Sequence, residues 1–335
     1  MKKDVSPYII LAVVAGLWIL FFPHFAKDFI SRYFYMPFLG IIAATVANTT
    51  PAAAGIVYFP ILTKLHISPI TAVQFSLVIQ AYGMGLGAFR WFLVNKRLFI
   101  FSVLPVCLAG GLAGLVVSIV FYPIANPGML SLIFNCIALL CTQFIFFSIL
   151  CKRKYPKLEV RLNKANVLIL LGFSFVGGLI SGWIGFGIDT MFYFILTVMF
   201  RINPAAAIVT SISLMAAMSI AGTILNVIFH SVPFSLWYSA IPGVTIAGLF
   251  LAAYLAMKLG AKNILILFSL LLSADFFVTF WTQQVIPISQ TTRMLVTHGL
   301  IIYLVYIHAR IFKESYKDID TSLGEFRPEQ GRINP

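Results

Sequence analysis

The chain has 335 residues, of which 61% are hydrophobic and only 10% are charged. Soluble domains carry about 25% charged residues, so this composition excludes an ordinary soluble domain and indicates a polytopic membrane protein. The net charge of +13 does not indicate nucleic-acid binding, because the basic residues lie in short loops between apolar runs, where they orient membrane spans. The four cysteines lack metal-ligand spacing, and neither a metal nor a cofactor is expected.

The N-terminal segment combines a basic start with an apolar run at about 8–22. It is similar to a secretory signal but lacks a small-residue cleavage site. We interpret it as an uncleaved first span with Lys2 and Lys3 in the cytoplasm, and a cleaved signal is the alternative.

The most informative stretch occurs twice, inside apolar segments of about thirty residues that are too long for one straight span. The first copy is NTTPAAAG at 48–55, and the second is WIGFGIDT at 183–190. The first copy begins with residues that cap helices, and Pro51 suits the first position of a new helix. Lipid cannot satisfy the free backbone groups of a broken helix, so we expect both breaks to line a cavity or to be buried in protein.

Each broken segment is followed by a similar order of long spans, which predicts two related halves. HISPITAVQFS (66–76) aligns with RINPAAAIVTS (201–211), and further along Pro105 aligns with Pro242. Full spans are predicted at about 68–89, 98–121, 128–150, 203–229, 235–258, 262–281 and 289–312. The expected organisation is an N-terminal span, a first repeat, a basic hinge, a second repeat, a last span and a tail, at 1–33, 34–150, 151–166, 167–282, 283–312 and 313–335.

The distribution of charge indicates whether each broken segment crosses the membrane once or returns to the side it entered. With the hinge in the cytoplasm, two re-entrant hairpins leave only four of the 23 basic residues outside, namely Lys27, Arg32, Lys64 and Arg293. A single crossing by the second segment would move the basic tail outside, against the positive-inside rule. The predicted fold is therefore all-α, with two inverted repeats, each a re-entrant broken hairpin plus three transmembrane helices, and with extra N- and C-terminal spans.

In both halves a broken helix rich in small residues is followed by a proline and a small polar stretch. The second half reads GGLISGWIGFGIDTMF (177–192) and then NPAAAIVTS (203–211), and the first half reads GIIAATVANTTPAAAGIVYFPIL (40–62) and then SPITAVQFS (68–76). Over roughly 36–282 the chain resembles the sulfite exporter TauE/SafE family of membrane permeases. The resemblance implies transport of small sulfur-containing or carboxylic anions such as sulfite and sulfonates. The chain departs from the family where the usual Gly-Gly-Gly run is replaced in both halves, and where Phe75 stands at the start of the Thr-Ser pair.

The two hairpin tips form the candidate anion site, because helix N-termini offer unpaired N–H groups and a partial positive charge. Thr49, Thr50 and Thr190 would add hydroxyl donors. The alternative is that the small residues only allow close helix packing, and that the polar side chains only bond neighbouring carbonyls. The residues expected to bind substrate are Asn48, Thr49, Thr50, Ala54, Gly55, Gln74, Ser76, Gln80, Gly185, Gly187, Asp189, Thr190, Thr210 and Ser211.

Asp189 is the most informative single residue, because an acid within an apolar segment costs about 2.5–3.5 kcal/mol on insertion scales. Such residues are functional candidates. Two interpretations stay open: the carboxyl caps the second arm of the hairpin, or it carries a proton that couples anion movement to the proton gradient.

The predicted function is transport of a small anion by alternating access, in a bacterial inner membrane with both termini in the cytoplasm. The expected partners are the anion, the lipid bilayer and a coupled proton, and a homo-oligomer is left open. A passive anion channel is one alternative. An intramembrane aspartyl protease using Asp189 and Asp275 is another, but Ile188 interrupts the motif it would need, and no enzyme activity is expected.

Overall fold

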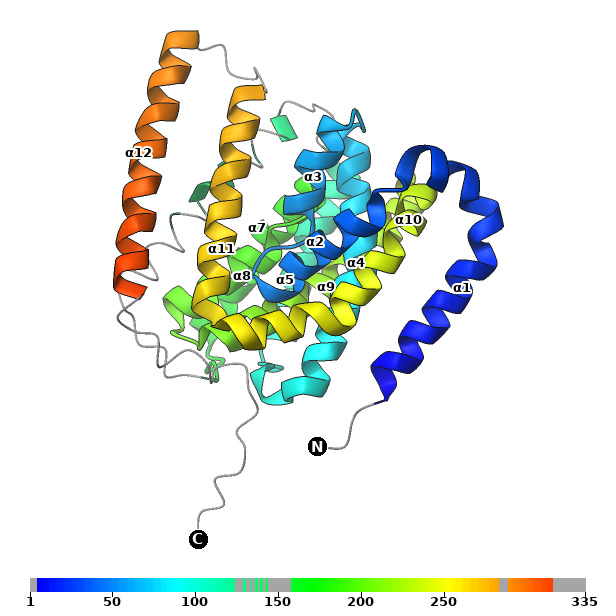
Figure 1. Cartoon of the computed structure of the whole chain (residues 1–335). Coiled ribbons are helices and arrows are strands. Elements are labelled where there is room, and N and C mark those ends of the chain that lie inside the picture. Colours follow the sequence, from blue (N-terminus) through cyan, green and yellow to red (C-terminus); the bar gives the residue numbers. More distant parts are fainter. Residues whose placement is uncertain are drawn as a thin grey trace.

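The computed structural model is a bundle of helices (Figure 1), and the described part of the chain contains no β-strand. The structure describes residues 5–123, 158–282 and 289–315, together with residues 129, 130, 133, 136, 137, 139, 140 and 143. Most of the predicted span at 128–150, the first part of the hinge and the tail from 316 onward therefore lie outside the described residues. So does the side chain of Asp275.

Six helical segments in the described part are long and apolar enough to cross a membrane. Many of the large apolar side chains on their outer faces are exposed, as expected for surfaces that contact lipid. An integral membrane protein is thus confirmed. The six segments are Ser6–Tyr33, Pro69–Leu98, Leu104–Phe121, Lys164–Ile184, Pro204–Phe229 and Phe234–Gly260.

The first half contains the first broken helix. Proline stands in the first turn of several of its helices, where the missing N–H costs little. In Figure 1, α3 leads back toward the side of the bundle from which α2 starts. The elements up to this point are α1 (Ser6–Asp28), η1 (Phe29–Tyr33), α2 (Met36–Thr49), α3 (Gly55–Lys64), α4 (Pro69–Asn95), η2 (Lys96–Leu98), α5 (Leu104–Val116) and the π-helical turn η3 (Val117–Phe121).

The second half repeats this order. If each broken helix is counted as one, α5 is the third helix of the first half and α10 is the third helix of the second half, and the two end in the same way. Both α5 and α10 have 13 residues and continue into a π-helical turn of 5 residues. The elements are α7 (Lys164–Ile184), α8 (Ile188–Phe194), η4 (Ile195–Met199), α9 (Pro204–Phe229), α10 (Phe234–Ile246), η5 (Ala247–Leu251), α11 (Ala252–Thr282) and α12 (Gln290–Ser315).

The helix boundaries agree with one of the two predicted alignments and differ at the other. Pro69 and Pro204 both begin their helices, as aligned. Pro105 stands in the first turn of α5, whereas Pro242 lies inside α10. The alignment of Pro105 with Pro242 thus pairs a proline in the first turn of one helix with a proline inside another, and this register stays a prediction.

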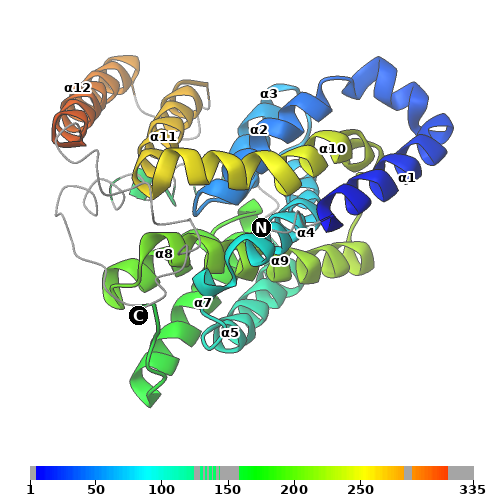
Figure 2. The ribbon, with the colours of Figure 1, turned by 60° about the horizontal axis from the view of Figure 1, so that its bottom comes forward.

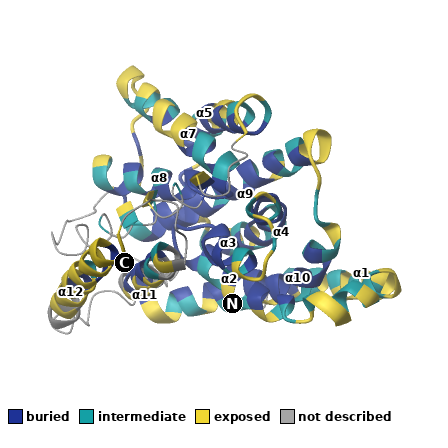
Figure 3. Cartoon of the chain, turned by 90° about the horizontal axis from the view of Figure 1, so that it is seen from above, coloured by how far each residue is buried: buried dark blue, intermediate teal, exposed yellow. Residues whose placement is uncertain are grey.

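The helices of the two halves are interleaved. The third helix of each half packs against the first arm of the other half, so that α5 lies on α7 and α10 lies on α2. At the centre α4 packs against α9, and each also contacts the short second arm of its own half, α3 or α8. Seen from above, the buried residues gather on α2, α3, α4, α8 and α9, while α1 and α12 are mostly exposed (Figure 3). Figure 2 shows these two exposed helices at opposite edges of the bundle.

The first arms of the two broken segments differ in length. With a rise of about 1.5 Å per residue, the 21 residues of α7 extend about 31 Å, enough to cross a bilayer core. The 14 residues of α2 extend only about 21 Å. The two broken segments thus share an element order but not a length.

Close contact between α5 and α7 depends on glycine. A Cβ at Gly178 would lie 2.1 Å from the carbonyl oxygen of Gly111, whereas a Cβ at Gly172 on the same helix would meet nothing within 4 Å. We expect Gly178→Ala to lower the free energy of unfolding by about 1–3 kcal/mol, the usual cost of overpacking. Gly172→Ala should not lower it, because the added Cβ meets no neighbour and alanine favours a helix over glycine. The thermal unfolding midpoints of the two purified variants test this, and equal midpoints would show that the contact is not required.

Candidate functional site

The two breaks arise from different residues. At the first, Thr50 leaves α2 in an extended conformation (φ −120°, ψ 164°), and α3 starts at Gly55. At the second, Gly185 (φ 81°) and Gly187 (φ 137°) both adopt positive φ values that side chains other than hydrogen rarely allow. The prediction that these two glycines permit the break therefore agrees with their backbone conformation.

The two breaks, which lie more than a hundred residues apart in sequence, are in direct contact. The hydroxyl of Thr190 donates to the carbonyl oxygen of Pro51 at 2.9 Å. The side-chain amide of Gln80 on α4 donates from Nε2 to the carbonyl oxygen of Gly185, also at 2.9 Å. A Cβ at Gly55 would lie 3.2 Å from that same carbonyl oxygen, closer than most side-chain contacts, so glycine at position 55 favours the close approach of the two segments.

Asp189 is fully buried at this junction. Its Oδ1 accepts a hydrogen bond of 3.2 Å from the N–H of Gly187, and the N–H groups of Asp189, Thr190 and Ala53 also interact with the carboxyl group. These donors include one from the other break. No described residue forms a hydrogen bond with Oδ2. The carboxyl therefore caps the start of α8 and leaves one oxygen unsatisfied.

The second arms of the two broken segments, α8 and α3, therefore differ in whether the N–H groups at their N-termini are already bonded. At α8 the first N–H groups are taken by side chains, since Gly187 bonds Asp189 and Ile188 bonds the hydroxyl of Ser181. At α3 the N–H groups of Ala52, Ala54 and Gly55 are buried and have no hydrogen-bond acceptor among the described residues. Free N–H groups at a helix N-terminus attract anions. The N-terminus of α3 is thus the stronger candidate for anion binding.

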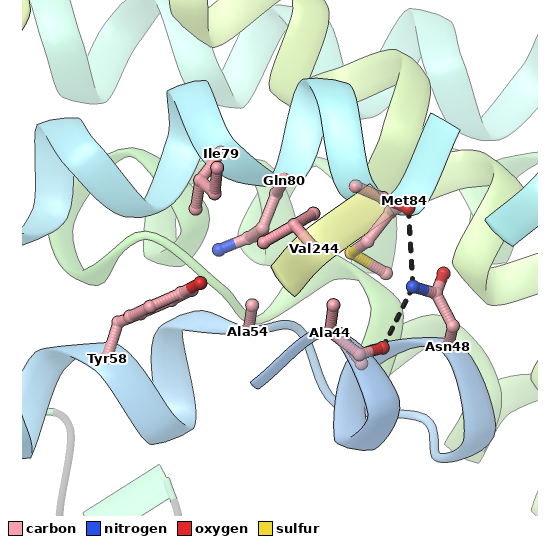
Figure 4. A pocket seen from close by; sticks show the side chains of 10 residues that line it. Ala44, Asn48, Ala54, Tyr58, Ile79, Gln80, Met84 and Val244 are labelled. Carbon is pink, nitrogen blue, oxygen red and sulfur yellow. Dashed lines mark hydrogen bonds between the residues drawn. The ribbon is translucent and has the colours of Figure 1, made fainter. Parts of the chain in front are cut away.

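A cavity of about 10 Å³, the size of one water molecule, lies beside this N-terminus. Ala54, Tyr58, Gln80 and Asn48 line it together with apolar side chains from α2, α4 and α10 (Figure 4). No described residue is a hydrogen-bond partner for the hydroxyl of Tyr58 or for Oε1 of Gln80, and both side chains are buried. Tyr58 is absent from the predicted site residues, although its position one turn after the first break was a usable signal.

The predicted site residues fall into two groups in the structure. Those of the two breaks, together with Ser76 and Gln80 on α4, lie around the junction: a Cβ at Gly185 would be 3.0 Å from Cβ of Ser76. Thr210 lies elsewhere, because its hydroxyl bonds the segment that joins α4 to α5, accepting from the N–H of Ile100 at 3.1 Å. Ser211 bonds the carbonyl of Ile208 on its own helix, and Gln74 does not line the cavity.

The hydroxyl groups near the breaks are not free to donate. Those of Thr49 and Thr50 donate to carbonyl oxygens of α2, and that of Thr190 donates to Pro51. Asn48 likewise donates from Nδ2 to the carbonyls of Ala44 and Gly83 (Figure 4). The three hydroxyl groups therefore bond protein carbonyls in this conformation, and backbone N–H groups remain as donors. That the threonines bind a ligand stays a prediction.

A family model described as sulfite exporter TauE/SafE matches residues 36–275. That range contains both breaks, the cavity and the helices around them. No match is found among curated proteins or among solved structures. Because the matched range covers well over half of the chain, the protein belongs to the sulfite exporter TauE/SafE family of membrane transporters.

Proposed function

We propose that the protein moves a small anion, sulfur-containing or organic, across the membrane by alternating access. The observation that carries this proposal is the set of three buried N–H groups at the start of α3 that have no acceptor in the part of the chain that the structure describes. They can hold an anion without a fixed positive charge, so that the anion can also leave. Family membership supports transport, and sulfite and sulfonates are the first substrates to test.

Alternating access needs two parts that rock against each other around one site. The repeated element order and the interleaved packing of α5 on α7 and α10 on α2 support an arrangement of two related halves. The cavity at the junction has room for one water only, which favours a closed transport intermediate over an open channel. The charge distribution of the loops supports inverted repeats with both termini in the cytoplasm. The proposed location is a bacterial inner membrane.

Asp189 is proposed as the site of proton coupling. No lysine or arginine stands within α8 or α9, and Lys164 of α7 lies at the far end of that helix. A charged carboxylate would be costly to bury here and would repel an anion at α3. A protonated carboxyl avoids both costs, so binding of an anion and of a proton would support each other.

Loss of one N–H group at the start of α3 tests the anion site. Ala54 has a φ of −61°, which proline also adopts, so Ala54→Pro removes the N–H without forcing the backbone from this angle. In wild type, a bound anion should raise the thermal unfolding midpoint of the purified full-length protein. We expect the rise to be lost in Ala54→Pro, with a loss of affinity of about tenfold or more, as for removal of one hydrogen bond to a charged group.

Ala54→Gly retains the N–H and is the matched control. The panel contains sulfite, sulfate, thiosulfate, taurine, sulfoacetate and simple carboxylates. If no anion raises the midpoint of wild type, or if Ala54→Pro responds as wild type does, the proposed anion site is wrong.

A further inference from the structure

Two buried polar atoms face the cavity beside α3, and helix packing explains neither. Tyr58 is 0% exposed and Gln80 is 1% exposed, and no described residue forms a hydrogen bond with the hydroxyl of the first or with Oε1 of the second. A buried polar group without a partner costs about 1–3 kcal/mol. Both side chains line the same cavity, on facing helices α3 and α4 (Figure 4). A ligand or a water molecule that enters this cavity therefore meets both atoms.

The orientation of the Gln80 amide is fixed by its surroundings. Its Nε2 donates to the carbonyl oxygen of Gly185 at 2.9 Å. Exchanging the amide oxygen and nitrogen would place two acceptors against each other, so only Nε2 can face Gly185. Gln80 consequently presents an acceptor, Oε1, as its unsatisfied atom.

The remaining polar side chain of the cavity wall, Asn48, supplies no free donor. The Nδ2 of Asn48 already donates to the carbonyls of Ala44 and Gly83, and the other lining side chains are apolar. A bare oxyanion has only lone pairs and would meet the lone pairs of Gln80 Oε1. A hydroxyl group can instead donate to Oε1 and at the same time accept from the Tyr58 hydroxyl.

We propose that the transported anion carries its own O–H or N–H donor, which binds between Gln80 Oε1 and the Tyr58 hydroxyl while its anionic oxygens bind the N–H groups of α3. Ala54 belongs both to that N-terminus and to the cavity wall, and the cavity holds one water-sized group, so only the O–H or N–H end of the anion enters it. The class comprises hydroxyalkyl- and aminoalkyl-sulfonates and the protonated forms of small oxyanions. This inference rests on the proposed function. It gives Tyr58 and Gln80 the role of selecting which anions bind.

A matched pair of ligands tests the inference on the full-length protein. Ethanesulfonate and 2-hydroxyethanesulfonate carry the same charge, and only the second has a donor. We expect the hydroxylated ligand to bind at least about tenfold more tightly, because a site built for a hydroxyl group rejects the analogue that lacks it. Apparent affinities come from the dependence of the thermal unfolding midpoint on ligand concentration.

Variants of Tyr58 and Gln80 test whether these two side chains cause the preference for the hydroxylated ligand. Tyr58→Phe and Gln80→Met should each reduce the preference toward onefold, mainly by weakening the hydroxylated ligand. Tyr82→Phe is the matched control for the first, since Tyr82 lies on the same helix as Gln80 and its hydroxyl bonds Thr245. Asn226→Leu is the control for the second, because it alters a buried amide of α9 that does not line the cavity.

The outcomes separate this inference from the proposed function. Equal affinities for the two ligands in wild type would overturn the inference and leave an anion site standing. The inference also fails if the preference persists undiminished in Tyr58→Phe, a variant that removes one of the two contacts and retains the packing of the ring. Absence of binding by any anion of either kind would overturn the proposed function and the inference together.

Discussion

Gly187→Ala is expected to remove anion binding and most of the folded protein. Gly187 has φ 137° and ψ −37°, a conformation that L-residues rarely adopt, which costs about 1–3 kcal/mol. An added Cβ would also lie 2.5 Å from Cγ2 of Ile180, and such overpacking costs about 1–3 kcal/mol more. The sum is a large part of the about 5–15 kcal/mol that stabilises a typical domain. Gly187 cannot relax freely, since its N–H bonds Asp189 and the next N–H bonds Ser181.

The yield of monodisperse protein after detergent extraction, together with its thermal unfolding midpoint, measures this effect. Gly85→Ala is the matched control, because a Cβ at Gly85 in the middle of α4 would meet nothing within 4 Å. Alanine is also the better helix former there. If Gly187→Ala were recovered with the wild-type midpoint and bound anions normally, the second break could not depend on this backbone conformation.

The positions of both breaks could be predicted because they rest on local rules. A bilayer-length apolar run does not extend to about thirty residues without interruption, and proline or glycine stands where each run stops. The structure places the breaks at Thr50–Ala54 and Gly185–Gly187, inside the predicted stretches. The family was likewise predicted, and the family match over 36–275 confirms it.

The register of the repeat was less predictable. Pro105 and Pro242 were aligned because LPVCLAGGLAG (104–114) resembles IPGVTIAGLFL (241–251), but the first stands in the first turn of a helix and the second lies inside one. What the two helices share is length and the π-helical turn that ends each of them. No single residue type encodes a π-helical turn, so comparing residues one by one does not reveal the shared feature.

The polar residues of the site were predicted as a group, but their roles were not. Sequence shows that threonines lie at the first break, yet it cannot show that their hydroxyl groups turn back to carbonyls of their own helix. It also cannot show that Tyr58 and Gln80 face one cavity, because this depends on how α3 packs on α4. The distinction between a free and an occupied helix N-terminus requires the directions of individual side chains.

Asp189→Asn is expected to make anion binding independent of pH. Asparagine has nearly the same shape and can still accept the N–H of Gly187, but it stays neutral. In wild type, raising the pH removes the proton, and the carboxylate then repels the anion, so affinity should fall as pH rises. For two charges about 5 Å apart at an effective dielectric constant of about 20, the repulsion is about 3 kcal/mol, or roughly a hundredfold in affinity.

The measurement must separate titration of the protein from titration of the ligand. A sulfonate keeps its charge throughout the accessible pH range, so any pH dependence of its binding arises in the protein. Asp28→Asn is the matched control, because Asp28 lies at the end of α1, where its Oδ2 accepts from the hydroxyl of Ser235 at 2.8 Å, outside the junction. A pH dependence retained in Asp189→Asn would leave the carboxyl as a cap of α8. Its loss in Asp189→Asn, but not in Asp28→Asn, would identify the buried carboxyl as the group through which proton and anion binding are coupled.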